Sequence, residues 1–271
     1  MTNVQQTYLK IPKRWKINLI FSIAMLVALI YSFAGSEINI LRLSSVFYSF
    51  KYMILAYTKI NWDLVLGMGI YPFSDGVVYM ALETLAMAFF GTLLGGILAI
   101  PLGFLSSETV GGKTGSRIGS AVLVLIRVFP EIILAVVLLK GFGINSMTCV
   151  MAIGIHSVGM LGKLFAEAID NMDKLPLEAL DAVGANRWQK IRFGILPQIA
   201  ADFSSVTLYR LDINVRSASV LGIVAAGGFG AMLSYASAPE NQSVLAALMV
   251  VIVPMILIMD AISGYLRGKL I

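Results

Sequence analysis

Ionisable side chains interrupt several apolar stretches of this sequence, and they are the residues most able to act on a solute. Three sets of opposite charge fall four residues apart, which places both partners on one face of a helix. These sets are Arg127 with Glu131, Lys163 with Glu167, and Asp212 with Arg216. Each set could neutralise itself, so internal pairing is one interpretation. A role along a solute path is the other, because charges within apolar spans are costly and often functional.

Two further charges, Glu83 and Arg210, have no partner at helical spacing. They could pair with each other between helices. Alternatively, Arg210 faces a water-filled path, where its guanidinium fork suits a tetrahedral oxyanion better than a lysine would. Serines and Asn214 make residues 198–226 the most polar of the apolar stretches. The residues predicted to line a path are Arg127, Glu131, Arg210, Asn214, Arg216 and Ser217.

The sequence contains little that could bind a metal, a nucleotide or another cofactor. His156 is the only histidine, and no second ligand stands at a helical spacing from it, so we expect a hydrogen-bonded packing role and no metal site. A phosphate-binding loop of the G-x-x-x-x-G-K-[ST] kind is absent, since the stretch 111–114 lacks the first glycine. Any ATP chemistry is therefore expected on another chain. Cys149 is the single cysteine and indicates no disulfide framework.

Composition indicates an integral membrane protein. Hydrophobic residues make up 58% of the chain and charged residues 13%, far from the averages of soluble domains. With about 20 residues per spanning helix, the 271 residues hold about six spans and leave no room for a second globular domain. The net charge of +5 comes from basic residues next to the spans, which favours membrane topology over nucleic-acid binding. We therefore predict an all-α bundle of about six transmembrane helices.

Three regions are expected along the chain. Residues 1–16 form a cytoplasmic segment, and residues 17–76 hold the first transmembrane helix and an interfacial segment with a short helix near 44–58. Residues 77–271 form the core. The predicted spans are 17–34, 77–105, 118–139, 146–170, 198–226 and 244–266. A cleaved secretory signal is the alternative for the first span.

Loops and kinks follow from glycine and proline. Residues 106–117 are expected to form a loop, and Pro101, Pro130 and Pro254 to kink their spans. Gly91 and Gly95 allow close helix approach, which we assign to packing within the chain. Phe229, between glycines, is a candidate apolar gate, and a plain turn is the alternative.

The distribution of basic residues predicts the orientation. If both termini are cytoplasmic, twelve lysines and arginines lie inside and four outside, in agreement with the positive-inside rule. The inside set is Lys10, Lys13, Arg14, Lys16, Lys113, Arg117, Lys174, Arg187, Lys190, Arg192, Arg267 and Lys269. The outside set is Arg42, Lys51, Lys59 and Lys140.

Residues 171–197 form a polar island between two spans, and they read as two helical pieces broken at a glycine. Asp173 is a candidate N-cap and Pro176 suits a first helical turn. Gly184 supplies a helix stop that tolerates a left-handed residue, and a basic, aromatic segment follows it. An exposed elbow that carries both charge signs suits docking into a groove on a soluble partner.

This stretch carries a resemblance to a known family. Glu178-Ala179, Gly184 and Leu196-Pro197 resemble the Glu-Ala-Ala, Gly and Ile-x-Leu-Pro cytoplasmic loop of permease subunits of binding-protein-dependent ABC importers. Leu180 stands where a second Ala is usual, and Gly194 where the Ile would fall. Stretches 156–167, 208–218 and 227–230 are similar to the permease of the phosphonate importer subfamily. The resemblance covers roughly residues 75–271.

The resemblance implies a type I importer permease in the bacterial cytoplasmic (inner) membrane, with no catalytic site of its own. It implies a homodimer with the path between the copies, two cytoplasmic ATP-binding subunits and an external substrate-binding protein. The solute would be a phosphonate, phosphite or related phosphorus oxyanion. The residues implied in coupling to the ATP-binding subunits are Glu178, Ala179, Asp181, Gly184, Ala185 and Arg187.

Three alternatives remain open at this point. An importer permease could carry another small solute. An ion-coupled secondary transporter would use acids such as Glu83 or Glu131 as proton sites and work without an ATPase. A membrane-embedded enzyme would need a metal set or a nucleophile with a base, against which a single histidine argues.

Overall fold

The computed structural model describes residues 14–35, 47–48, 50–51, 54–55, 57, 60–69, 72–225, 227–236, 238 and 241–270, and the regular structure among them is helical. The chain divides into two compact units, Met1–Tyr52 and Met53–Ile271. In the first unit, helix α2 (Arg14–Gly35) has an apolar window, Trp15–Ser32, that is 0% buried. A helix long and apolar enough to cross a membrane thus lies where the first span was expected. Most of the interfacial segment expected near 44–58 lies outside the described residues.

The second unit contains the longer helices. Among the described residues of both units, four helices are long and apolar enough to cross a membrane, one of them α2 and the other three in the second unit at Val77–Ser106, Ser146–Asn171 and Ser243–Leu270. Up to six spans result if two bent helix pairs each count as one. The expectation of about six spans agrees with this. The long helices of the second unit are α5 (Val77–Ser106), α8 (Ser146–Asn171), α11 (Leu196–Ala225) and α13 (Gln242–Leu270).

Helices α5 and α8 share the most extensive contact of the bundle, and small residues on both sides make this possible. A Cβ built on Gly91 would lie 2.7 Å from Ile153 Cγ2, and one on Gly95 would lie 2.7 Å from Ser157 Cβ. These distances are shorter than real Cβ contacts, so only glycine lets the two backbones approach this closely. Gly91 and Gly95 thus pack within the chain, as expected.

The predicted third span, 118–139, is wrong as one continuous helix. Helix α6 (Glu108–Val128) and helix α7 (Glu131–Phe142) meet at an 85° bend. Phe129 has extended backbone angles, φ −77° and ψ 120°, because the ring of Pro130 disfavours the helical region for the residue before it. Pro101 and Pro254, by contrast, lie inside the helices α5 and α13.

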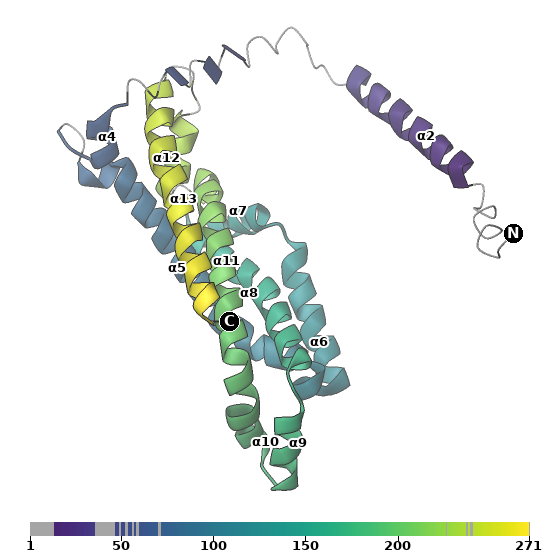
Figure 1. Cartoon of the computed structure of the whole chain (residues 1–271). Coiled ribbons are helices and arrows are strands. Elements are labelled where there is room, and N and C mark those ends of the chain that lie inside the picture. The colour runs from purple at the N-terminus through teal and green to yellow at the C-terminus, as the bar shows by residue number, and fades with distance from the viewer. Residues whose placement is uncertain are drawn as a thin grey trace, which may run out of the picture. The chain divides into compact units, whose positions relative to one another are not determined.

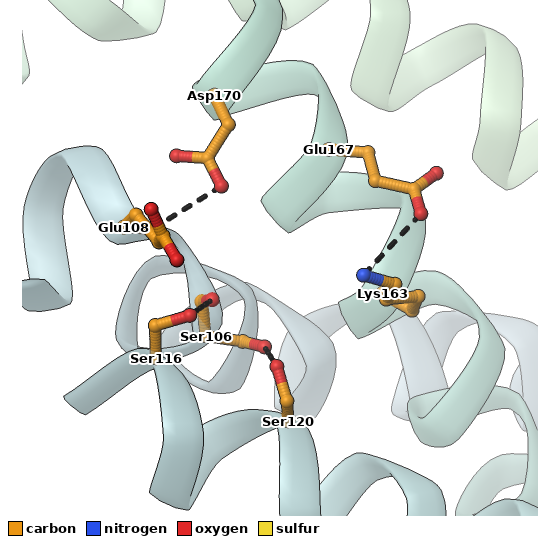
Figure 2. A network of polar contacts seen from close by, with 7 residues as sticks. All are labelled: Ser106, Glu108, Ser116, Ser120, Lys163, Glu167 and Asp170. Atoms are coloured by element: carbon orange, nitrogen blue, oxygen red, sulfur yellow. Dashed lines mark hydrogen bonds and ion pairs between the residues drawn. The ribbon is translucent and has the colours of Figure 1, made fainter. Parts of the chain in front are cut away.

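The loop expected over residues 106–117 is also wrong. Ser107 begins a helix there, because its hydroxyl accepts from the backbone N–H of Thr109 at 3.1 Å. Helix α6 turns back at once over the end of α5. Ser106 Oγ lies 2.8 Å from Ser120 Oγ, and Ser116 donates to the carbonyl of Ser106 at 2.7 Å (Figure 2).

Shorter helices close the two ends of the second unit. Helix α4 (Trp62–Leu66) and helix α12 (Gly228–Ala236) lie towards one end in Figure 1, while α9 (Leu175–Ala182) and α10 (Arg187–Gln189) lie together at the other. The single turn η3 (Phe73–Asp75) precedes α5, and the π-helix η4 (Lys190–Ile195) joins α10 to α11. The stretch 171–197 is thus an end piece of the bundle, connected directly to α8 and α11.

Candidate functional site: the Gly184 elbow and a buried polar cluster

The first helical piece of the elbow, residues 171–197, is built as its sequence suggests. Asp173 Oδ1 accepts from the backbone N–H of Leu175 at 3.0 Å, although Lys174 occupies the N-cap position itself. Pro176 lies in the first turn of α9, where a missing N–H leaves no hydrogen bond unmade. Glu178 lies in the same turn, near the positive end of the helix dipole.

Gly184 ends this helix in the left-handed region, with φ 75°. Its N–H donates to the carbonyl of Asp181 at 3.0 Å, and the N–H of Ala185 donates to the carbonyl of Leu180 at 2.9 Å. Together these bonds make a Schellman motif. A Cβ on Gly184 would meet nothing within 4 Å, so the requirement for glycine comes from the backbone conformation alone.

The second piece begins with a reciprocal cap. Gln189 N–H donates to Asn186 Oδ1 at 3.0 Å, and Asn186 N–H donates to Gln189 Oε1 at 2.8 Å. From Arg187 the chain stays helical through η4 into α11. An ion pair between Lys190 and Asp181 joins the two pieces. The elbow is therefore held in shape by its own local contacts.

The outer surface of the elbow presents most of the predicted coupling residues. The exposed ones are Glu178, Ala179, Asp181, Gly184 and Arg187, while Ala185 is half-buried. The predicted coupling set omitted two apolar side chains beside them, Val183 at 79% exposure and Trp188 at 77%. Their signal in the sequence is that large apolar residues flank the glycine within a polar island. Charged and apolar groups together are typical of a protein-docking surface.

A polar cluster lies inside the bundle, where α5, α8 and α11 meet. Arg210 is 4% exposed, and its Nε donates to Ser157 Oγ at 3.0 Å. Asn214, which is fully buried, donates from Nδ2 to the same oxygen at 3.0 Å and to Thr92 Oγ1 at 2.7 Å. Arg210 Nη2 and Asn214 Oδ1 have no protein hydrogen-bond partner. The cluster both binds three helices together and retains unused donor and acceptor capacity.

Glu131 extends this cluster from α7. It lies near Ser217 and within electrostatic range of Arg210, and its Oε1 has no protein hydrogen-bond partner. The bend at Pro130 brings it there, because Glu131 begins α7 rather than continuing α6. Four of the predicted path residues are thus brought together: Glu131, Arg210, Asn214 and Ser217.

The two remaining path candidates lie elsewhere. Arg127 is exposed on α6, and the i,i+4 pair predicted between it and Glu131 is wrong because the helix breaks between the two residues. Arg216 pairs with Asp212 at 2.7 Å, as its spacing predicted, and also lies 3.7 Å from Asp260. The third predicted pair, Lys163 with Glu167, is present at 3.4 Å.

Glu83 does not pair with Arg210. Its Oε2 accepts from the backbone N–H of Gly228 at 3.0 Å, and its other oxygen accepts from Ser146 Oγ. Glu83 therefore caps the N-terminus of α12, where a carboxylate complements the helix dipole. Phe229, the predicted gate, is the next residue of α12 and is 1% exposed, with its N–H donating to Thr84 Oγ1 at 3.0 Å. His156 is half-buried on α8, and its Nδ1 has no protein hydrogen-bond partner among the described residues.

Several known permeases are similar to this chain. The phosphite transport system permease protein of Stutzerimonas stutzeri is 35% identical over 187 residues, which cover 69% of this chain and 68% of that protein. The phosphate-import permease protein of Mycolicibacterium smegmatis is 35% identical over 192 residues, 69% of this chain but 36% of that protein. A putative cryptic phosphonate transport system permease of Escherichia coli K12 is 40% identical over 121 residues, covering 45% and 99% respectively.

Solved structures agree on the fold. The inward-facing MetNI methionine ABC transporter matches with a TM-score of 0.64 at 23% identity, covering 72% of this chain and 95% of that chain. The family model for binding-protein-dependent transport system inner membrane components matches residues 99–271. The chain therefore belongs to that family, and it is a multi-pass membrane permease with the fold of type I ABC importers.

Proposed function

We propose that this permease forms, as a homodimer, the translocation path of an ATP-driven importer for small phosphorus oxyanions. Two ATP-binding subunits would dock on the Gly184 elbows, and an external binding protein would deliver the solute. The observation that most supports this proposal is the elbow itself, an exposed projection that is held by its own local contacts and is continuous with α8 and α11.

The docking surface would combine the coupling residues with their apolar neighbours. Glu178 and Asp181 offer carboxylates, Arg187 a guanidinium, and Val183 and Trp188 large apolar side chains, all exposed on one short segment. Aromatic and arginine side chains dominate binding energy at protein interfaces. Because Lys190 already holds Asp181 from inside the elbow, the segment can be pushed as a unit rather than unfold.

Movement of the elbow would reach the polar cluster through two helices. Ser157 is on α8 and Arg210 on α11, and the elbow connects these two helices directly. A change in the angle between α8 and α11 would alter the contact of Arg210 with Ser157. Such a change is how we propose that ATP-driven closure opens and closes the path.

The solute class is argued from two sources. The similar permeases carry the names of phosphite, phosphate and phosphonate transport systems. In addition, Arg210 keeps one buried guanidinium nitrogen without a protein partner, and a guanidinium binds tetrahedral oxyanions through paired hydrogen bonds. We propose that Arg210, Asn214 and Ser217 meet the solute, with Glu131 positioning Arg210. Both termini and the elbow are proposed to be cytoplasmic.

Uptake by reconstituted vesicles tests the proposal. The permease is purified with its ATP-binding subunits, inserted into liposomes, and supplied with its binding protein and with phosphite, methylphosphonate or inorganic phosphate. ATP-dependent accumulation of at least one probe is the expected result. Accumulation driven by a pH gradient without ATP-binding subunits would instead favour ion coupling through the buried Glu131.

A further inference from the structure

A second set of contacts links the elbow to the rest of the bundle, and it involves helix α6 as well as α8. Asp170 is the penultimate residue of α8, directly before the elbow begins. Its carboxylate reaches across to the start of α6 and accepts from four donors. These are Ser107 Oγ at 2.6 Å, Thr109 N at 3.0 Å, Thr109 Oγ1 at 2.9 Å and Glu108 N at 3.1 Å. Figure 2 shows Asp170 facing Glu108 across this gap.

These contacts are of a strong kind. A carboxylate at a helix N-terminus meets backbone N–H groups that have no partner within the helix, and it complements the positive end of the helix dipole. Hydrogen bonds to an ionised acceptor are also shorter and stronger than neutral ones. Asp170 therefore fixes the first turn of α6 to the last turn of α8.

Gly112, with φ 66° and ψ 178°, interrupts α6 between the turn that Asp170 holds and the rest of the helix, but both parts pack closely on the end of α5. Helix α6 packs so closely on the end of α5 that a Cβ on Gly119 would lie 2.8 Å from Ser106 Cα, and one on Gly111 would lie 2.1 Å from the Leu105 carbonyl oxygen. The serine contacts between Ser106, Ser116 and Ser120 add to this. Packed elements of this kind move as bodies rather than deform.

We propose that Asp170 is a positioning residue that transmits displacement of the elbow to α6, and through α6 to α7 and Glu131. This proposal rests on the proposed function, because it assumes that the elbow is pushed by ATP-binding subunits. It adds a further route to the polar cluster, one that ends at Glu131 rather than at Arg210. Glu131 is the first residue of α7, so a tilt of α6 would shift it against Arg210 and Ser217.

The chain offers a matched control one turn away. Glu167 pairs with Lys163 on its own helix at 3.4 Å, and both side chains are about half exposed, at 50% and 45%. Figure 2 shows this pair beside Asp170. Glu167→Gln removes the same charge from the same end of α8 without touching α6.

The experiment measures ATP hydrolysis and uptake of phosphite, methylphosphonate and inorganic phosphate in the same vesicles. For Asp170→Asn, we expect ATP hydrolysis to persist while uptake per ATP hydrolysed falls by about 2- to 30-fold, the range of couplings measured for single residues. Glu167→Gln should leave both quantities unchanged. Thr109→Val, which removes one donor hydroxyl and keeps the N–H, should cause a smaller loss. A purely structural role would lower the thermal midpoint and leave uptake per ATP unchanged.

Gly184→Val separates failure of this proposal from failure of the proposed function. If Gly184→Val uncouples hydrolysis from uptake but Asp170→Asn and Thr109→Val do not, the role of Asp170 is overturned and the elbow keeps its own. If neither position affects uptake per ATP, the elbow does not couple ATP hydrolysis to transport, and both proposals are wrong. If Asp170→Asn does not assemble with the ATP-binding subunits, uptake per ATP hydrolysed by Thr109→Val tests the role of Asp170 instead.

Discussion

Gly194 lies directly against Leu180 where the two pieces of the elbow pack together. A Cβ built on Gly194 would lie 3.0 Å from Leu180 Cδ1 and 2.7 Å from Leu177 Cδ2. Both positions depart from the pattern that the sequence otherwise resembles, with a larger residue at 180 and a smaller one at 194. The geometry gives one reason for both: the side chain of Leu180 fills space that a larger residue at 194 would need.

Gly194→Ile should therefore destabilise the elbow, because overpacking of this kind costs about 1–3 kcal/mol. Adding Leu180→Ala should recover part of the loss, but not all of it, since Leu177 also lies in the way. The thermal midpoints of the unchanged permease, the two single variants and the double variant measure the coupling between positions 180 and 194. Gly264→Ile is the control, because a Cβ on Gly264 meets nothing within 4 Å. Additive effects of Gly194→Ile and Leu180→Ala would contradict the complementary packing.

Gly184→Val should uncouple ATP hydrolysis from uptake, because the left-handed conformation costs a non-glycine residue about 1–2 kcal/mol, with a β-branched residue at the upper end. Gly184→Asn should retain more uptake, because asparagine tolerates this conformation better. Nothing surrounds a Cβ at this position, so crowding cannot explain a difference between the two. Equal uptake by both variants would show that the backbone angle is not the critical property.

Local signals explain what could be predicted from the sequence. Long apolar runs define the spans through hydropathy, and the elbow follows from a proline, a glycine and capping residues that act within a few positions of one another. The pairs Lys163 with Glu167 and Asp212 with Arg216 also depend only on helical spacing. Each of these features is settled by neighbours along the chain.

The features that were missed depend on residues far apart in the sequence. Glu83 binds the N–H of Gly228, which is 145 positions away, and Asp170 binds Ser107, which is 63 positions away. No spacing rule connects such residues. All three prolines were expected to kink their spans, but Pro130 breaks its span whereas Pro101 lies inside the continuous helix α5, so a proline in the sequence does not by itself distinguish the two outcomes.

Arg210→Lys should reduce uptake of the phosphorus probes and raise the half-saturating concentration. A lysine keeps the charge, but its three N–H groups radiate from one nitrogen and cannot replace the separate guanidinium nitrogens that contact Ser157 and Met160 and face an oxyanion. Loss of one charged hydrogen bond, worth about 1.5–3 kcal/mol, predicts a fall of about 10- to 150-fold. Arg117→Lys, at an exposed position on α6, is the matched control. A loss of thermal stability with an unchanged half-saturating concentration would assign Arg210 to packing only.

Phe229→Ala tests the proposed gate. If the buried phenyl ring closes the path, its removal should let phosphite leak across vesicles without ATP. Removal of a buried aromatic ring also costs about 3–5 kcal/mol, so the thermal midpoint must be followed in parallel. Phe142→Ala is the control, because Phe142 is 46% exposed and its ring contributes little to the core. No phosphite leak together with a lowered thermal midpoint would mean that Phe229 contributes only to core packing.

Thiol labelling tests the orientation, and the sequence suits it because Cys149, the single cysteine, is buried. Ala182→Cys places a thiol at the exposed end of α9, and Gly268→Cys places one near the end of α13. Lys140→Cys places one in the exposed last turn of α7. Since basic residues favour the cytoplasmic side, a membrane-impermeant reagent should label the first two in inside-out vesicles only, and Lys140→Cys in right-side-out vesicles only. The reverse pattern would place the elbow outside, beyond the reach of a cytoplasmic ATPase.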